Sequence, residues 1–275
     1  MKIASLSLAP RTSSLVLSTV GLLAGLGSPA TAPAEGPAQH YEVRSYLLSE
    51  SGEGSADDER AIDRYLRDAL LPALGRHGIG PVGVFRNAAS DETGSPRIVV
   101  VIPFDDPAEF AQIRSTIATD AGYQAAAKEY LGRGPKESPY RRIQSEWLIA
   151  MDCMPRMDVP KGTLETDARV YELRVYESAN ERLGRLKVDM FNAGEVPIFL
   201  DSGIQPIFIG QALIGPQLPS LTYLTVYPSE ETRLRAWDTF RSHPDWKVLS
   251  RDPKYAGTVS RIDKFVLVAK PYSQM

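Results

Sequence analysis

Apolar and polar residues alternate along residues 41–48, and a period of two predicts a half-buried β-strand. From Ser55 onward the apolar positions recur at helical spacing instead, which predicts an amphipathic helix. The next 100 residues change period several more times. We expect strands at 79–86, 97–102 and 142–151, with a helix capped by Asp105 or Asp106 and a further helical turn before the last strand.

The same order of elements recurs in the second half of the chain. The pattern Tyr-Glu-x-Arg-x-Tyr occurs at 41–46 and again at 171–176. Prolines and glycines keep a common offset after it, as Pro72 and Pro197 do, and these residue types mark positions with special backbone dihedrals. We therefore predict two homologous halves, each with the βαββαβ order of the ferredoxin-like unit.

Such a unit has helices on one face of its sheet, so the other face needs a cover. The sheet of the other half is the simplest cover, and it gives a closed two-sheet barrel from one polypeptide. The predicted fold class is thus α+β, with two tandem ferredoxin-like repeats. We place the first repeat at 35–152, a linker at 153–168 and the second repeat at 169–275.

The first 34 residues have a different character. They contain no Asp or Glu, and Lys2 and Arg11 precede an apolar run at 15–26 that is short for a bilayer span. Small residues follow, and a small-x-small site ends at Ala34. We expect a signal peptide over 1–34, cleaved near Ala34, and export to the periplasm or the medium. A disordered terminus and a mitochondrial transit peptide are the alternatives, the latter disfavoured by its single arginine and contiguous apolar run.

Composition excludes several classes of partner and cofactor. When Lys2 and Arg11 are removed from the 31 basic residues, 29 remain against 34 acidic ones, and no basic stripe indicates nucleic acid. No segment suits an integral membrane span. The single Cys153 excludes an internal disulfide, and we expect it to be buried. Three scattered histidines form no metal cluster, and the G-x-G-x-x-G match at 78–83 follows a helix rather than a strand, so we predict no metal or cofactor.

The repeated strand resembles the opening strand of the NIPSNAP family, and Arg241 to Trp246 is similar to its Arg-x-x-x-x-Trp element. The resemblance covers 170–270 and, more weakly, 40–150. It implies the dimeric α+β barrel fold, here as a pseudo-dimer within one chain. The wider superfamily includes cofactor-independent oxygenases, haem-degrading enzymes and lactone isomerases. NIPSNAP proteins have no settled molecular activity, so the resemblance implies a fold and little chemistry.

The two faces of the repeated strand differ in polarity. Alternation places Glu42, Arg44 and Tyr46 on one face, and Tyr41 and Val43 on the other. We expect the polar face to meet the partner sheet and the apolar face to pack beneath helices. Buried ions need partners, which a two-fold arrangement would supply across the repeats.

The second copy carries the matching residues Glu172, Arg174 and Tyr176. We therefore predict structural ion pairs between Glu42 and Arg174 and between Glu172 and Arg44. The alternative is that Arg44 or Arg174 binds a carboxylate or enolate ligand in a barrel pocket, which suits the planar guanidinium.

Neither His77, at a helix-to-strand turn, nor His243, before a proline, is duplicated. Each could serve one retained pocket or simply end a helix. The candidate ligand-binding residues are therefore the histidines together with the arginines and tyrosines of the two strands: Arg44, Tyr46, His77, Arg174, Tyr176 and His243.

We favour an exported protein that is non-catalytic or binds a small molecule in the barrel. The alternative is a cofactor-independent oxygenase or isomerase for a small aromatic or enolisable substrate, which requires His77 or His243 to point into a pocket. A haem-dependent variant would need a buried histidine facing a slot. An interaction module with a large exposed apolar patch is a third possibility. Whether the protein is an enzyme stays open at this point.

Overall fold

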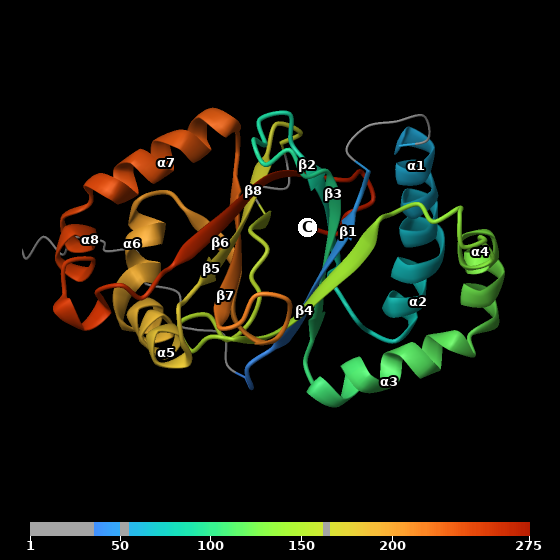
Figure 1. The fold of residues 1–275 in the computed structure, drawn as a ribbon, viewed down its shortest axis with the longest axis horizontal. Helices are drawn as coiled ribbons and strands as arrows, with labels where there is room; N and C mark the ends of the chain where they lie inside the picture. Colours follow the sequence, from blue (N-terminus) through green and yellow to red (C-terminus); the bar gives the residue numbers. More distant parts are fainter. Residues whose placement is uncertain (1–35, 50–54, 162–165) are drawn as a thin grey trace, which may run out of the picture. The chain divides into compact units, whose positions relative to one another are not determined.

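Eight strands close into one barrel in the computed structural model, which describes residues 36–49, 55–161 and 166–275 (Figure 1). The predicted signal peptide and its cleavage site lie outside these residues. In chain order the strands are β1 His40–Leu47, β2 Gly83–Asn87, β3 Arg97–Phe104, β4 Arg142–Ala150, β5 Val170–Glu177, β6 Gln205–Ile214, β7 Ser220–Tyr227 and β8 Arg261–Ala269.

The strand order around the barrel is β1-β3-β2-β8-β5-β7-β6-β4, and every neighbouring pair is antiparallel. Each half therefore contributes four adjacent strands, and the halves join where β2 meets β8 and where β4 meets β6. Each half also follows the βαββαβ order. The predicted α+β fold, a barrel made by two tandem repeats of one chain, is confirmed. Residues 153–160, in the predicted linker, contain no helix or strand.

Helices cover the outside of the barrel in two groups, one from each half (Figure 1). The first group is α1 Ser55–Tyr65, a π-helical turn Leu66–Leu70, α2 Leu71–Arg76, α3 Pro107–Ala118 and α4 Ala121–Leu131. The second group is α5 Glu181–Met190, a π-helical turn Phe191–Glu195, α6 Val196–Asp201, α7 Glu230–Ser242 and α8 Pro244–Leu249, with a short 3₁₀ turn at Pro253–Tyr255.

Side chains at the helix starts explain where several helices begin. Asp106 caps α3, as predicted, and Ser229 caps α7. Asn180 caps α5, while the Ser178 hydroxyl donates to the carbonyl oxygen of Thr258. None of the helices among the described residues is long and apolar enough to cross a membrane.

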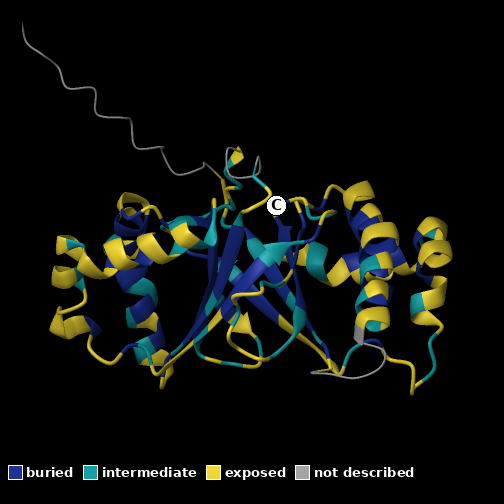
Figure 2. Cartoon of the chain, turned by 90° about the horizontal axis from the view of Figure 1, so that it is seen from above, coloured by how far each residue is buried: buried dark blue, intermediate teal, exposed yellow. Residues whose placement is uncertain are grey.

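The core has three parts, one inside the barrel and one beneath each group of helices. Figure 2 shows the strands buried and the outer helix faces exposed. Tyr41 and Val43 lie inside the barrel, whereas Tyr46 packs beneath the first group of helices. The predicted orientation of the repeated strand is therefore reversed. The narrow barrel interior accepts apolar side chains from both sheets, and the polar set faces the helices.

One end of the barrel interior is closed by aromatic packing. The rings of Tyr41 and Phe208 lie 4.8 Å apart, and those of Phe85 and Tyr171 lie 4.7 Å apart. Met157 from the predicted linker packs against the same cluster. The barrel is thus filled at the end where β1 and β5 begin.

Cys153 is half-buried rather than fully buried. Burial raises the pKa of its thiol to about 12, so the nucleophilic thiolate is scarce at neutral pH.

Candidate functional site

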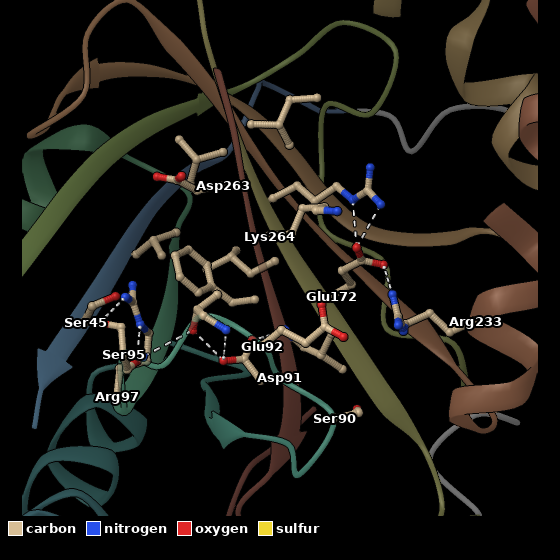
Figure 3. Close-up of a pocket in the computed structure, with 18 of the residues that line it drawn as sticks. Ser45, Ser90, Asp91, Glu92, Ser95, Arg97, Glu172, Arg233, Asp263 and Lys264 are labelled. Carbon is tan, nitrogen blue, oxygen red and sulfur yellow. Dashed lines mark hydrogen bonds and ion pairs between the residues drawn. The ribbon is translucent and has the colours of Figure 1, made fainter. Parts of the chain in front are cut away.

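A cavity of about 1280 Å³ opens at the other end of the barrel, where β1 and β5 finish. Both halves line it. Its inner part lies in the barrel mouth, and its outer part passes over β8 towards α7. Asp263 and Lys264 mark the two parts, since they lie on either side of β8 (Figure 3).

The floor of the inner part is apolar. Val43, Leu173 and Phe265 line it, and all three belong to the core inside the barrel. Towards solvent the side chains that line the cavity become shorter and more polar, with Ser45 and Val175 above the floor. Above this floor the side chains no longer fill the barrel interior.

Glu146 is the buried carboxylate of this inner part, with 8 % of its surface exposed. The hydroxyl of Thr222 donates to its Oε2 at 2.9 Å. No Lys, Arg or His lies within ion-pair distance of it in the part of the chain that the structure describes. Burial therefore raises the pKa of Glu146, against the opposing effect of the Thr222 hydrogen bond.

Arg97 is the half-buried cation of the inner part. Its guanidinium carbon lies 3.8 Å from the centre of the Phe265 ring, a cation–π arrangement. Its Nη2 donates to Ser95 Oγ at 2.9 Å and its Nε to the Ser95 carbonyl oxygen at 3.2 Å. Among the described residues it makes no ion pair. Burial lowers the pKa of Arg97, while the charges of Asp91 and Asp263 act the other way.

A side chain from the loop between β6 and β7 reaches over the mouth. The Nε2 of Gln217 donates to Glu177 Oε1 at 2.5 Å and to Asp263 Oδ2 at 2.8 Å. Arg261 Nη2 pairs with Asp263 Oδ1 at 2.9 Å. These contacts occupy the carboxylates of Glu177 and Asp263 at the rim.

The outer part of the cavity rests on a saturated ion network around Glu172, which is 1 % exposed (Figure 3). Glu172 accepts from Arg174 Nε at 2.9 Å, from Arg233 Nη1 at 3.1 Å and from Trp237 Nε1 at 2.6 Å. The Arg174 guanidinium lies 3.5 Å from the centre of the Trp237 ring. Every polar atom of this carboxylate is occupied, which is the arrangement of a structural network.

The predicted ion pairs between the repeats are wrong. Arg44 pairs with Glu42 at 2.9 Å, and Arg174 pairs with Glu172 at 2.8 Å, each within its own strand. Residues i and i+2 share a face and lie about 7 Å apart along a strand, so a guanidinium can reach the carboxylate beside it. The carboxylates therefore need no partner from across the barrel.

Of the six candidate ligand-binding residues, only Arg174 lines the cavity. Arg44 and Tyr46 are held between the sheet and the first group of helices, with Arg44 Nη1 3.5 Å from the Tyr46 hydroxyl. Tyr176 lies beneath the second group of helices, where Arg174 Nη1 and the Tyr223 hydroxyl both donate to its hydroxyl.

The histidines do not reach the cavity, contrary to what the enzyme alternative required of them. His77 is exposed at the C-terminal end of α2, and His243 caps α8 by accepting from the Asp245 backbone N–H. These are the helix-end roles considered above. No histidine lines the cavity, so its residues do not offer the ligand that the haem variant requires. Within the described ranges no group of three His, Cys, Asp or Glu could hold a metal ion.

Sequence reasoning missed Arg97 and Glu146. The sequence pattern could have indicated both, because each lies an even number of residues from apolar residues of the barrel interior and so shares their face of the strand. Arg97 is in phase with Val99 and Val101, and Glu146 with Leu148. A charged residue in phase with buried apolar ones indicates a polar position inside a core.

The closed barrel of two βαββαβ units defines a dimeric α+β barrel formed within one chain. Residues 171–274 match the NIPSNAP family, so the resemblance is confirmed for the second half of the chain. A comparison with curated proteins found no match.

Solved structures show the same fold over most of the chain. A proposed monooxygenase from Fusobacterium nucleatum subsp. nucleatum has a TM-score of 0.53 at 9 % identity, covering 85 % of this chain and 93 % of its own. One from Lactobacillus acidophilus has a TM-score of 0.50 at 12 % identity, covering 84 % and 94 %. A NIPSNAP-like domain protein from Burkholderia xenovorans matches at 20 % identity, with a TM-score of 0.36, over 39 % of this chain and 90 % of its own. At these identities the first two similarities show the fold alone.

Proposed function

We propose that the protein binds a small organic molecule in the inner part of the barrel-mouth cavity, and that binding rather than catalysis is its main activity. One observation carries the proposal. The same barrel is packed with aromatic rings at one end and hollow at the other. An eight-stranded barrel is just wide enough to be filled by side chains or to hold one small ligand.

The mouth has the composition of a ligand site. Its floor is apolar, and a few polar groups, among them Glu146 and Arg97, line it from different strands. Small-molecule sites combine an apolar lining with a small number of placed polar groups in this way. Ser45 and Val175 leave space that larger residues would fill.

Native mass spectrometry of protein purified from its own cells tests the proposal. Wild-type protein should carry a small-molecule adduct that is lost on denaturation. Val175→Trp should abolish the adduct because the indole fills the mouth, whereas Val248→Trp, at a side chain 74 % exposed and outside the cavity, should keep it. Equal occupancy in both variants, or an empty wild type that no small organic molecule stabilises against heating, would contradict it.

A cofactor-independent oxygenase or isomerase is the second candidate, and Glu146 favours it. Burial raises the pKa of Glu146, which makes the carboxylate a stronger base towards an enolisable carbon. Two similar structures are described as proposed monooxygenases, which motivates the assay.

Proton exchange and oxygen consumption with small phenols and 1,3-diketones test this candidate. Glu146→Gln should lower either rate at least ~100-fold, in the range that general bases contribute. Glu92→Gln, at an exposed carboxylate of the same cavity, should leave the rate unchanged. Equal rates in the two variants would exclude Glu146 as the base.

We also propose that the protein is exported, on the basis of the acid-free segment 1–34. The protein recovered from the periplasm or the medium should begin at Glu35 by intact mass. Recovery only in the cytoplasm with Met1 still present would contradict export.

A further inference from the structure

The inner part of the cavity holds two charged groups that no neighbour neutralises. Arg97 makes no ion pair in the described ranges, and its hydrogen bonds use Nε and Nη2, which leaves Nη1 open. Glu146 has one partner, the Thr222 hydroxyl on Oε2, which leaves Oε1 open. Buried or half-buried charges need such partners, so both atoms are positions for a ligand to complete.

The strand order places these groups on opposite walls. Glu146 pairs in register with Val43, and Phe265 pairs with Leu173. Val43 and Leu173 occupy the same position of the repeated strand, so Glu146 and Phe265 are equivalent in the two halves. Their strands, β4 and β8, are four places apart in a ring of eight, which is the largest separation. Because the Arg97 guanidinium lies over Phe265, it faces Glu146 across the barrel.

The space between them suits a ligand about one ring wide. Eight tilted strands about 4.8 Å apart enclose a barrel on the order of 15 Å across between backbones. The stacked Phe265 and Arg97 occupy one wall and Glu146 the other, so the space between these side chains is narrower than the barrel itself. Val43 and Leu173 give that space an apolar floor.

Charge defines the two ends of the ligand. A single guanidinium with Asp91 and Asp263 nearby favours a monoanion over a dianion such as phosphate. Its planar fork matches a carboxylate. Opposite it, a hydroxyl suits Glu146 in either protonation state, because a hydroxyl both donates and accepts.

We infer that the cavity binds a small cyclic or aromatic hydroxy acid, with its carboxylate on Arg97 and its hydroxyl on Glu146. The inference rests on the proposed function and names its ligand class. The exposed Lys264 in the outer part of the cavity takes no part in it.

Titration calorimetry of the mature chain with five probes tests the inference. The probes are 3-hydroxybenzoate, 4-hydroxybenzoate, benzoate, phenol and tyramine. The better hydroxybenzoate should bind tightest. Benzoate should bind at least ~5-fold weaker because it lacks the hydroxyl for Glu146, and phenol weaker still because it lacks the carboxylate for Arg97. Tyramine should not bind measurably, because its ammonium would face the Arg97 guanidinium.

Variants separate the two contacts. Arg97→Gln should weaken the acids at least ~10-fold and leave phenol unchanged, and Arg97→Lys should recover part of the loss without the bidentate contact. Glu146→Gln should reduce the preference for hydroxybenzoate over benzoate while leaving benzoate unchanged. The control Lys264→Gln should change no probe by more than ~2-fold. Thermal melting establishes that each variant is folded.

The outcomes distinguish the inference from the proposed function. If phenol or tyramine binds and the acids do not, or if Arg97→Gln leaves the acids unaffected, the inference is wrong while a small-molecule site remains. If no probe binds and native protein carries no adduct, both fail.

Discussion

The repeated strand of the first half and that of the second half bury the same carboxylate beside the same guanidinium, but they complete its hydrogen bonds differently. In the first half Ser145 Oγ donates to Glu42 at 2.7 Å. In the second half Arg233 and Trp237 donate to Glu172. An identical motif has thus been placed in two environments, a single ion pair and an extended network. The motif itself specifies only the pair within the strand.

The helices above the strands show a larger difference. The first half places Ile62 of α1 and Leu70 of the following π-helical turn, both buried, in its apolar core. The equivalent residues of the second half are Lys187 and Glu195, which form a buried ion pair at 2.7 Å. Lys187 Nζ also lies 4.7 Å from the centre of the Phe191 ring. The same position thus accepts either an apolar contact or an ion pair, provided that both residues change together.

Breaking that buried pair should have the largest effect. Lys187→Ile leaves Glu195 buried without its cation, and burial already raises the pKa of Glu195. We expect the free energy of unfolding to fall by about 3–5 kcal/mol. Urea denaturation followed by circular dichroism measures it.

The double variant Lys187→Ile/Glu195→Leu copies the first half and is the matched control. It should recover most of the loss, because replacing a buried pair by apolar residues is often neutral or stabilising. A double variant as unstable as the single one would show that the second half cannot accept the packing of the first.

Neutralising the strand carboxylates compares the two networks directly. Glu172→Gln leaves Arg174 and Arg233 facing an amide, whereas Glu42→Gln leaves only Arg44. We expect losses of about 3 kcal/mol for Glu172→Gln and about 1–2 kcal/mol for Glu42→Gln in the same urea assay. Equal losses would mean that the second half gains nothing from its additional donors.

Trp237→Phe removes one donor from the larger network. The ring that covers Arg174 is retained, but the indole N–H to Glu172 is lost. A loss of about 1–2 kcal/mol is expected from the unsatisfied acceptor. Thermal unfolding should show it, and Trp147→Phe, whose indole lies in the aromatic cluster of the first half, is the comparison. A larger loss of stability for Trp147→Phe would indicate that these rings stabilise the protein mainly by packing.

The smallest effect concerns Glu146 and depends on pH. Its folded-state pKa is raised above the unfolded value, so the native state binds more protons between those two values. Its contribution to stability is therefore complete below the unfolded pKa, about 4.3, and is lost as pH rises through the folded pKa. Glu146→Gln should be more stable than wild type above this window and equal to it below. Parallel urea curves at pH 4 and pH 8 check the sign, and a variant less stable at pH 8 would contradict it.

The sequence supports the fold more strongly than the site, for a physical reason. Shared prolines and the repeated Tyr-Glu-x-Arg-x-Tyr indicate positions where the two halves have the same backbone geometry. Alternation divides Tyr41 from Glu42, but it does not say which face meets the helices, and that choice was predicted the wrong way round. Arg97 and Glu146 become a site only when β3 and β4 curve into one barrel, which no local pattern reports.

The joining of two repeats in one chain has a consequence for how this barrel could diverge. In a barrel made from two identical subunits, every substitution would appear twice, and a glutamate at the position of Glu146 would face a second glutamate where Phe265 stands. Two carboxylates on opposite walls would repel each other, and no phenyl ring would remain to support Arg97. When both repeats lie in one chain, a residue on one wall of the barrel can change while the equivalent residue on the other wall stays the same. The polarity of the cavity, with a carboxylate on one wall and a guanidinium on the other, is thus a product of gene duplication as much as of folding.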